Sequence, residues 1–410
     1  MIYFGDTELL GLKIGNTDIS AVYAGDLLIW PTSVTGWSVT PSQIEVEASG
    51  GSENIKIASL SAWTISSSES WVTFSQNSGD SGRTTVTATI ASHTSSSSRT
   101  ATITVTDGTN VSTISVSQEA YADYSSQYFT MEILTAGTIV WKAGTSTSTS
   151  TRRTIQYSKN NGAWTSIKAT TGGVSFSVSV GDIVRFKGTN TTYSTQSGGT
   201  YAHTFSSSTA SFNAYGNIMS LISGDNFQTA YTFSATYVFR NFFNNTNVLD
   251  ASNLVLPATA LTEGCYMAMF GSAKLQRPPK LPATVLAKSC YFNMFLSVSA
   301  LTEVPELPAT ALTENCYRAM FYQCTNITTA PDLPAPALAT NCVYQMFDGC
   351  TKLSYIKCLA TSILSTSNRT NWVRNVASSG TFVKSPDITE SAWGRGVTGI
   401  PNGWTVINNS

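Results

Sequence analysis

Apolar and polar residues recur with a fixed period in the C-terminal half of the chain. The motif Leu-Pro-Ala-Thr occurs three times and Leu-Pro-Ala-Pro once, beginning at Leu256, Leu281, Leu307 and Leu333. Successive starts are separated by 25, 26 and 26 residues. A period in this range is typical of a solenoid, in which each unit packs only against its neighbours.

Each unit carries a second apolar group that begins nine residues after its leucine. A cysteine stands there, with a leucine four residues before it and Met-Phe four and five residues after it; the cysteines are Cys265, Cys290, Cys316 and Cys342. Leu, Cys and Met at i, i+4 and i+8 share one face of a helix. Residues 327–333 are typical of a short extended segment. The pattern therefore predicts one helix and one short strand in each unit.

A helix and a strand at this period resemble a leucine-rich repeat. The motifs quoted above are similar to the BspA-type leucine-rich repeats of Bacteroidetes surface proteins and their phages. A degenerate earlier unit lies at 238–243, and the array runs over residues 223–358. Residues 359–410 resemble the segment that ends many BspA-like arrays, which implies a C-terminal cap in which Trp372 and Trp404 cover the last unit.

Residues 1–35 carry a shorter repeat of their own. Gly-Asp or Gly-Asn recurs every ten residues, at Gly5, Gly15 and Gly25, and an apolar run follows each pair. These dipeptides favour tight turns, so we predict a small β-meander. About 30 residues bury too little surface to be stable alone, so we expect the meander to dock on another surface. The line from Val22 to Trp30 resembles short N-terminal modules of tailed-phage structural proteins.

Residues 36–120 alternate polar and apolar positions in short runs separated by Ser/Thr-rich turns. About seven short strands in a segment of this length favour an immunoglobulin-like sandwich. The order of Gly50-Gly51, Trp63, Trp71 and Arg99 resembles a BACON domain. Such domains occur in Bacteroidetes surface enzymes and in structural proteins of crAss-like phages, and their name implies carbohydrate binding. Trp63 and Trp71 are candidates for a sugar platform, but alternation favours their burial in the core.

The pattern of residues 121–222 predicts a second β-sandwich. An Asn-Gly turn at Asn161-Gly162 separates two alternating runs, and a turn at Gly181-Asp182 precedes a further apolar strand. Because a bare solenoid end exposes its stacking core, we expect this region to cover the first repeat. The predicted fold class is therefore multidomain and mainly β, with an α/β leucine-rich-repeat solenoid at its C-terminal end.

Composition narrows the possible partners. Charged residues make up only 11% of the chain and the net charge is −1, so a nucleic-acid partner is not expected. No apolar run is long enough to predict a membrane span. All seven cysteines lie between Cys265 and Cys358, and their recurrence predicts a ladder of small buried thiols. A disulfide framework or a metal site fits the spacing less well.

Catalytic constellations are not evident in the sequence. The two histidines, His93 and His203, lie in Ser/Thr-rich stretches and are expected in solvated loops. Acidic pairs such as Glu303 and Glu306 are more simply residues of a solvated face than the opposed carboxylates of a glycosidase. We therefore predict no enzyme activity, no catalytic residue, no metal and no cofactor.

Binding is better supported than catalysis. Two residues after each cysteine the identity changes from unit to unit: Met267, Phe292, Arg318 and Tyr344. Positions kept across repeats build the stack, whereas positions that vary are free to face a partner. The alternative is neutral variation on an exposed helix face, since scattered surface apolar residues are common.

The combined pattern suggests a phage virion protein, a fibre or a decoration protein on head or tail, similar to those of crAss-like phages. Residues 1–35 would bind other virion proteins, and the repeats would contact a glycan or protein on the host surface. The stretch after Met1 lacks the basic and apolar regions of a signal peptide, so we expect either a trimmed mature chain or one that is assembled in a cytoplasm, as virion proteins are. We also expect a homo-oligomer. The alternative is a Bacteroidetes cell-surface adhesin or glycan-binding protein with the same modules.

Overall fold

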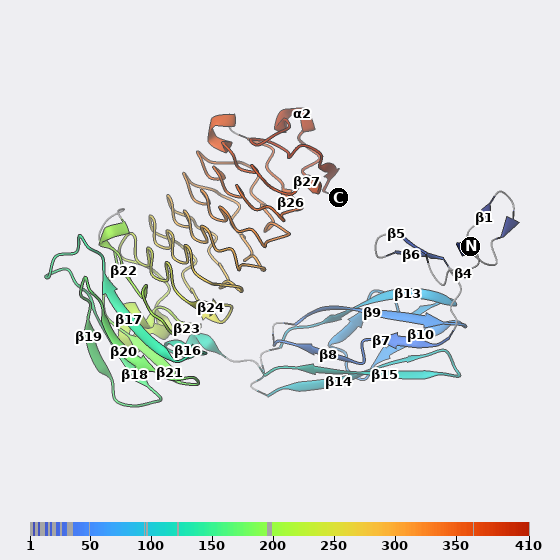
Figure 1. The fold of residues 1–410 in the computed structure, drawn as a ribbon, viewed down its shortest axis with the longest axis horizontal. Helices are drawn as coiled ribbons and strands as arrows, with labels where there is room; N and C mark the ends of the chain where they lie inside the picture. The colour runs from blue at the N-terminus through green and yellow to red at the C-terminus, as the bar shows by residue number, and fades with distance from the viewer. Residues whose placement is uncertain are drawn as a thin grey trace. The chain divides into compact units, whose positions relative to one another are not determined.

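The computed structural model describes residues 36–409 except 49, 94, 96, 121–122, 195–198 and 364, and also six short strands within the first 30 residues. The chain is mainly β, as predicted, and its strands form several sheets (Figure 1). It divides into two compact units, Met1–Asp123 and Tyr124–Ser410. The five-part division expected from the sequence is finer than this, and its boundaries stay a prediction.

The six N-terminal strands form three antiparallel pairs, each of which flanks one of the Gly-Asp or Gly-Asn dipeptides. The pairs are β1 (Tyr3–Phe4) with β2 (Thr7–Glu8), β3 (Lys13–Ile14) with β4 (Thr17–Asp18), and β5 (Val22–Ala24) with β6 (Leu27–Trp30). The remainder of residues 1–35, and with it the predicted docking surface, lies outside the described residues.

The described part of residues 36–120 is a sandwich of two sheets. One sheet has the order β12-β10-β14-β15-β8 and the other β11-β13-β9-β7. Their strands are β7 (Ser38–Thr40), β8 (Gln43–Val46), β9 (Gly51–Ser59), β10 (Trp63–Ser67), β11 (Val72–Phe74), β12 (Ser78–Gly79), β13 (Gly82–Ile90), β14 (Arg99–Thr106) and β15 (Val111–Gln118). The apolar positions of the alternating strands face the core, so the immunoglobulin-like, β-rich character is confirmed.

The next region builds a larger sheet that continues into the repeats. Its described strands have the order β19-β18-β21-β16-β23-β24, with β25 also paired to β23, and a second sheet has the order β20-β17-β22. The strands are β16 (Phe129–Ile133), β17 (Gly137–Ala143), β18 (Thr154–Lys159), β19 (Thr165–Lys168), β20 (Val174–Val178), β21 (Ile183–Lys187), β22 (His203–Thr204), β23 (Phe212–Asn217), β24 (Val248–Asp250) and β25 (Leu254–Val255).

This β region and the repeats share one hydrophobic core. Strand β23 pairs in parallel with both β24 and β25, which belong to the first turns of the repeat part. One cluster of buried side chains runs without interruption from Phe129 to Trp404. The region therefore covers the first end of the stack, in line with the role expected for it. A short helix, α1 (Ser220–Ser223), joins the two parts.

The helix predicted in each repeat is wrong. Residues 256–354 are described throughout and contain no helix; they form a series of linked turns, one coil per repeat (Figure 1). Alternate backbone N–H groups donate to the next coil, as Ala268 N does to Phe292 O at 2.8 Å. The N–H groups between them close turns on carbonyls three residues earlier, as Met267 N does on Gly264 O at 3.1 Å.

Left-handed residues explain why a helix does not form. In one coil Gly264, Ala268 and Ser272 have φ of 59°, 51° and 55°, and equivalent positions in the next coils also have positive φ. A right-handed helix needs negative φ at every residue. A turn that repeats every four residues still places Leu261, Cys265 and Met269 on one side, where all three are buried. The apolar spacing of four therefore suits this turn as well as a helix.

Aromatic side chains stack between coils inside the core. The phenylalanine column consists of Phe270, Phe295, Phe321 and Phe347, with ring centroids 5.5 to 5.8 Å apart. The tyrosine column consists of Tyr266, Tyr291 and Tyr317, with centroids 5.9 and 6.1 Å apart. All seven cysteines are free and buried, as predicted. Burial raises the pKa of the Cys265 thiol to about 12, so it stays protonated and unreactive near neutral pH.

Residues 359–410 close the far end of the stack. Strands β26 (Tyr355–Cys358), β27 (Thr381–Lys384) and β28 (Thr405–Asn408) form a parallel sheet. The ring of Trp372 is buried between Phe347, at 6.3 Å, and Trp393, at 5.6 Å. Its indole N–H donates to Gly399 O at 2.7 Å. Trp404 is also buried, and its indole donates to Ala377 O at 2.7 Å. Both tryptophans thus fill the closing segment as expected.

The expectation of a solvated His203 is wrong. Its side chain is fully buried on β22, where Nε2 accepts from the backbone N–H of Arg153 at 3.0 Å. Because a backbone N–H can only donate, Nε2 carries no proton, and Nδ1–H donates to Tyr193 O at 2.9 Å. Burial lowers the pKa of His203 to about 4. His93 is half-buried, with Nε2 2.5 Å from Glu119 O.

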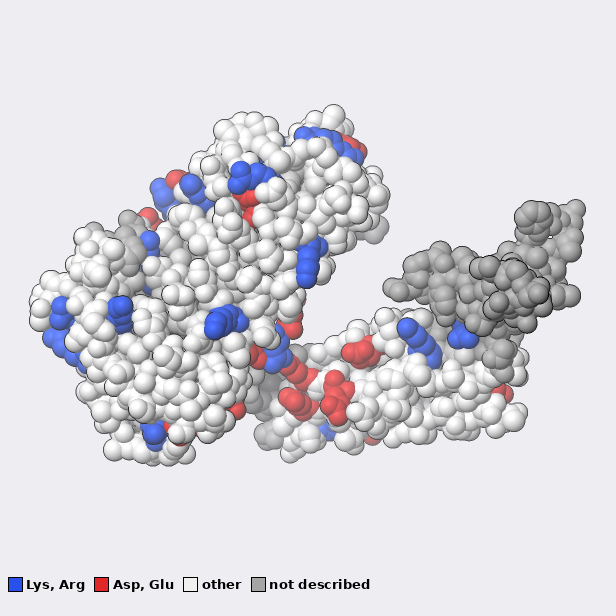
Figure 2. Space-filling view, viewed as in Figure 1, with Lys and Arg blue, Asp and Glu red and all other residues white. Residues whose placement is uncertain are grey.

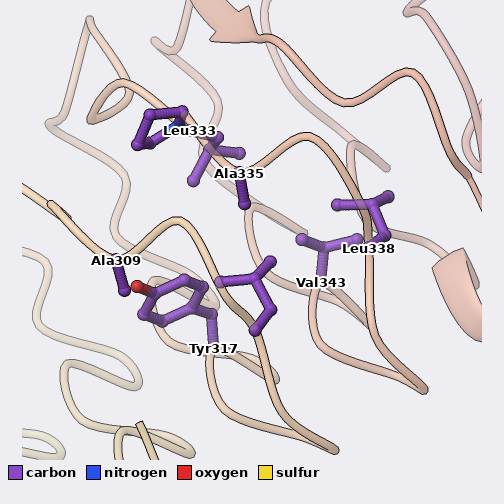
Figure 3. Close-up of a pocket in the computed structure, with 8 residues that line it drawn as sticks. Ala309, Tyr317, Leu333, Ala335, Leu338 and Val343 are labelled. Atoms are coloured by element: carbon purple, nitrogen blue, oxygen red, sulfur yellow. The ribbon is translucent and has the colours of Figure 1, made fainter. Parts of the chain in front are cut away.

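A small apolar pocket opens where the tyrosine column ends (Figure 3). The donation of Tyr317 N to Cys342 O aligns Tyr317 with Val343, so a valine stands where the three preceding coils have a tyrosine. The pocket is lined by Ala309, Leu312, Tyr317, Leu333, Pro334, Ala335, Leu338 and Val343. It lies beside Val343, the position at which a fourth ring of the column would stand.

Filling this pocket should stabilise the protein. We predict that Val343→Phe raises the free energy of unfolding by about 1 kcal/mol, because the added ring regains contacts that the smaller side chain cannot make. Val343→Ala should lower it by about 2 kcal/mol, because the space grows. Thermal unfolding of both variants measures the effect. A destabilised Val343→Phe would show that the neighbouring coils cannot accept the ring.

Acid should weaken the fold through His203. The unfolded histidine has a pKa of about 6.5, above its folded value, so below pH 6.5 the unfolded chain binds the proton first. Stability therefore falls as the pH drops from about 6.5 to about 4, by roughly 3 kcal/mol in full. Urea unfolding of the wild type and His203→Gln should show a stability difference that shrinks over this range. An equal difference at pH 7 and pH 4 would contradict the assignment.

Candidate functional site

The four predicted binding residues lie in one file on successive coils. Backbone donations from Ala268 to Phe292 O, from Asn293 to Arg318 O and from Ala319 to Tyr344 O, at 2.8, 3.0 and 2.8 Å, fix this alignment. We call Met267, Phe292, Arg318 and Tyr344 the outer column. The same register continues it to Arg240 on one side and Thr370 on the other.

Turn geometry points the outer column away from the core. Each member follows a buried residue, such as Tyr317 before Arg318, and precedes a left-handed residue, such as Ala319 with φ of 48°. The chain changes direction there, so the side chain lies at an outer corner. Phe292, Arg318 and Tyr344 are half-buried, whereas Met267 is only 7% exposed. The predicted exposed helix face is therefore a row of turn corners, and Met267 offers a partner the least surface.

Arg318 is held between two aromatic rings. Its Cζ lies 5.3 Å from the ring centroid of Phe292 on the preceding coil and 4.5 Å from that of Tyr344 on the following coil. Such cation–π contacts contribute about 0.5–1 kcal/mol each at exposed sites. The two rings flank the guanidinium from the preceding and the following coil, and its N–H groups can still form hydrogen bonds. One of these groups, Nη1, donates to Asn315 Oδ1 at 3.4 Å.

Neighbouring carboxylates are already paired with other cations. Glu314 Oε2 lies 3.0 Å from Lys288 Nζ. Asp348, which is almost fully buried, accepts from Arg374 Nε at 2.9 Å and Nη2 at 2.7 Å. This hydrogen bond raises the pKa of Arg374 above its ordinary value. Arg318 forms no ion pair with any carboxylate in the described part of the chain, so its charge remains available.

The surface around the outer column is polar but sparsely charged. Half-buried amides border it, from Asn293, Asn315 and Gln345. On the face that Figure 2 shows, lysines, arginines and acidic residues are scattered over the coil part among uncharged side chains. The column can therefore supply one clamped cation, aromatic edges and amide hydrogen bonds. Binding is the chemistry that this set of groups supports.

Trp63 and Trp71, the two candidates for a sugar platform, do not form an open one. Trp63 is 1% exposed and lies in the sandwich core. Trp71 is half-buried, and the guanidinium of Arg99 covers its ring at 4.1 Å. Arg99 is in turn fixed by Gln118 Oε1 at 2.7 Å and by Ala91 O at 2.6 Å. One ring face of Trp71 is thus occupied within the domain.

Sequence reasoning missed a second cluster of rings and cations, on the outer face of the larger sheet. Lys187 Nζ lies 4.5 Å from the ring of Trp164, and Arg185 Cζ lies 5.7 Å from it. Lys187 also pairs with Asp225 at 2.8 Å, and Asp225 accepts from the hydroxyl of Tyr128 at 2.6 Å. Alternation along β21, which places Arg185 and Lys187 on one face, was the available signal.

The described residues give little support for a metal site, for a pair of opposed carboxylates or for a membrane-spanning helix. They contain no group of three or more His, Cys, Asp or Glu side chains placed to hold a metal ion. Glu303 and Glu306 are both exposed, as expected. None of the described helices is long and apolar enough to cross a membrane.

Comparison with known families identifies one segment. Residues 61–119 match the BACON domain family, described as "Putative binding domain, N-terminal". The match lies inside the sandwich of residues 36–120 and covers most of its strands. No curated protein matches the chain.

Three solved structures are similar to parts of the chain. A Bacteroides ovatus GH5 xyloglucanase in complex with a XXXG heptasaccharide has 31% identity and a TM-score of 0.20; the match covers 22% of this chain and 21% of that one. An NMR structure of a protein from Bacteroides thetaiotaomicron has 19% identity and a TM-score of 0.16; the match covers 25% of this chain and 97% of that one. The CsuC-CsuE chaperone-tip adhesion subunit complex of Acinetobacter baumannii has 7% identity and a TM-score of 0.19; the match covers 35% of this chain and 90% of that one. The chain thus spans about a fifth of the xyloglucanase.

Proposed function

We propose that the chain is a non-enzymatic recognition protein whose outer column binds a ligand on the surface of a Bacteroidetes cell. The observation that carries this proposal is the guanidinium of Arg318, which two rings hold in place and which pairs with no described carboxylate. A cation that is restricted in this way and has no described carboxylate partner is well prepared for an external anion.

The proposed setting is a phage particle, in which the chain is a head or tail fibre or a decoration protein. Residues 1–35 would attach it to other virion proteins, and copies would assemble into a homo-oligomer. The repeats would be a helix-free form of the BspA-like leucine-rich repeats, which the period and the Leu-Pro-Ala and Cys-Met-Phe motifs support. The BACON match supports the link to Bacteroidetes.

The same BACON match also favours a second candidate, a cell-surface adhesin or glycan-binding protein of a Bacteroidetes bacterium. In both cases the outer column recognises a surface ligand; the two differ in where the chain is attached. Immunogold labelling distinguishes them, because antibodies against the chain would decorate phage particles in the first case and uninfected cells in the second.

Binding to cells tests the recognition role. We predict that the purified full chain binds at least one strain in a panel of Bacteroidetes cells. Replacing Phe292, Arg318 and Tyr344 together by alanine should weaken this binding roughly tenfold or more, because the central ring and arginine contacts of an interface carry most of its energy. Flow cytometry with labelled protein measures the effect.

The matched control removes a nearby ion pair instead. Lys288→Ala with Glu314→Ala deletes two charges next to the outer column, and an exposed pair of this kind adds little stability. Cell binding should be almost unchanged. If the triple alanine variant bound as well as the wild type, or if the wild type bound no strain, the proposed function would be wrong.

A further inference from the structure

We infer that the group held at Arg318 is the anionic substituent, a carboxylate or a sulfate, of a polysaccharide that lies along the outer column. This inference rests on the proposed function and specifies its ligand. It follows from the shape of the guanidinium site, from the pairing of the charges around it and from the way the coil backbone is used.

The rings determine which part of Arg318 a ligand can reach. Arg318 Cζ lies 5.3 and 4.5 Å from the ring centroids of Phe292 and Tyr344 on the two neighbouring coils, so we expect a ligand to reach the guanidinium between the rings, at its N–H groups. Two parallel N–H groups of a guanidinium match the oxygens of a carboxylate or a sulfate and can bind them as a fork. Because the rings already restrict the side chain, binding costs less conformational entropy than it would for a free arginine.

Charge pairing excludes an internal partner within the described residues. Glu314 lies on the same coil as Arg318, and Asp348 lies on the same coil as Tyr344. Glu314 pairs with Lys288, and Asp348 pairs with Arg374. The Asn315 amide is a neutral and long partner for Arg318, at 3.4 Å. An external anion would therefore add a charge-assisted hydrogen bond without breaking an existing ion pair.

The coil backbone argues against an extended peptide as the ligand. Peptides commonly bind by adding a strand to a free sheet edge or by filling an apolar groove. Here the N–H groups of Ala268, Asn293 and Ala319 donate to the next coil, so the column presents no free edge. The described pocket is lined by other residues, at the end of the tyrosine column (Figure 3).

The polar groups beside the column suit a sugar chain. Asn293, Asn315 and Gln345 are half-buried amides there; Asn315 Nδ2 donates to Glu314 and Gln345 Nε2 to Asp348, which leaves the Gln345 oxygen and the Asn293 amide for a ligand. The Tyr344 hydroxyl adds a further polar group. Amides can donate to and accept from sugar hydroxyls at once, while ring edges contact apolar sugar faces. The column continues over successive coils in one line, which fits a chain ligand better than a compact one.

Direct binding to defined polymers tests the inference. The probes are polygalacturonate for carboxylate, dextran sulfate for sulfate, unmodified dextran for a neutral sugar and polyglutamate for an acidic peptide. Isothermal titration with the full chain should show binding to one or both acidic polysaccharides and none to dextran. The stronger of the two identifies the anionic group.

Two single substitutions isolate the arginine. Arg318→Gln should lower the affinity for the acidic polysaccharide roughly tenfold to a hundredfold, as expected when a charge-assisted hydrogen bond is lost. Lys288→Gln removes the same charge nearby, where it is already paired, and should change the affinity by less than about twofold. Unchanged melting temperatures show that both variants are folded.

Several outcomes would overturn the inference. These are equal binding of dextran, equal affinity of the wild type and Arg318→Gln, binding of polyglutamate as tight as that of the sugars, or no binding of either acidic polysaccharide. The last result leaves the proposed function intact if the triple alanine variant still loses cell binding. If that variant keeps cell binding, the proposed function itself fails.

Discussion

The hydrogen bonding of one coil to the next is the constraint on which the repeat half of the molecule depends. A left-handed residue at every fourth position, such as Gly264, Ala268 and Ser272, turns alternate N–H groups toward the neighbouring coil. The groups between them close local turns. Because the backbone polar groups are satisfied in this way, the turns can be packed face to face although they contain no helix.

This register converts a repeated sequence into straight columns of equivalent side chains. The phenylalanine column, which faces inward, keeps one residue type, and its rings stack with centroids 5.5 to 5.8 Å apart. Columns that face outward are free to vary. The outer column uses this freedom to place an arginine between two rings, contributed by residues that are 26 positions apart. The rigid stack thus supplies the preorganisation that a binding surface needs.

The sequence predicted the columns of equivalent side chains better than it predicted the local backbone conformation. The period, the buried free cysteines and the grouping of Phe292, Arg318 and Tyr344 follow from residue spacing alone. The predicted helix failed because a four-residue turn and a helix bury the same i, i+4 positions, and the recurrent Gly264, Ser289, Asn315 and Asn341 were the overlooked sign of left-handed turns. The burial of His203 depends on the distant Arg153 and Tyr193, which no local pattern relates to it.

The small number of charged residues determines how the chain could bind the proposed anionic ligand. With a net charge of −1 and few charged residues, the chain has little long-range attraction for a polyanion, so affinity must come from a few fixed contacts. Arg318 is suited to this because its charge is both held in place and unpaired among the described residues. The BACON sandwich, by contrast, uses Arg99 to cover Trp71 from within.

Hydroxyl-radical footprinting tests the central claim most directly. The full chain is oxidised with and without a polysaccharide extracted from the surface of cells that it binds, and modified residues are located by mass spectrometry. If the outer column is the recognition surface, oxidation of Phe292 and Tyr344 falls on binding while that of Trp71 does not change. Protection confined to residues 36–120, with Phe292 and Tyr344 oxidised as before, would contradict the account.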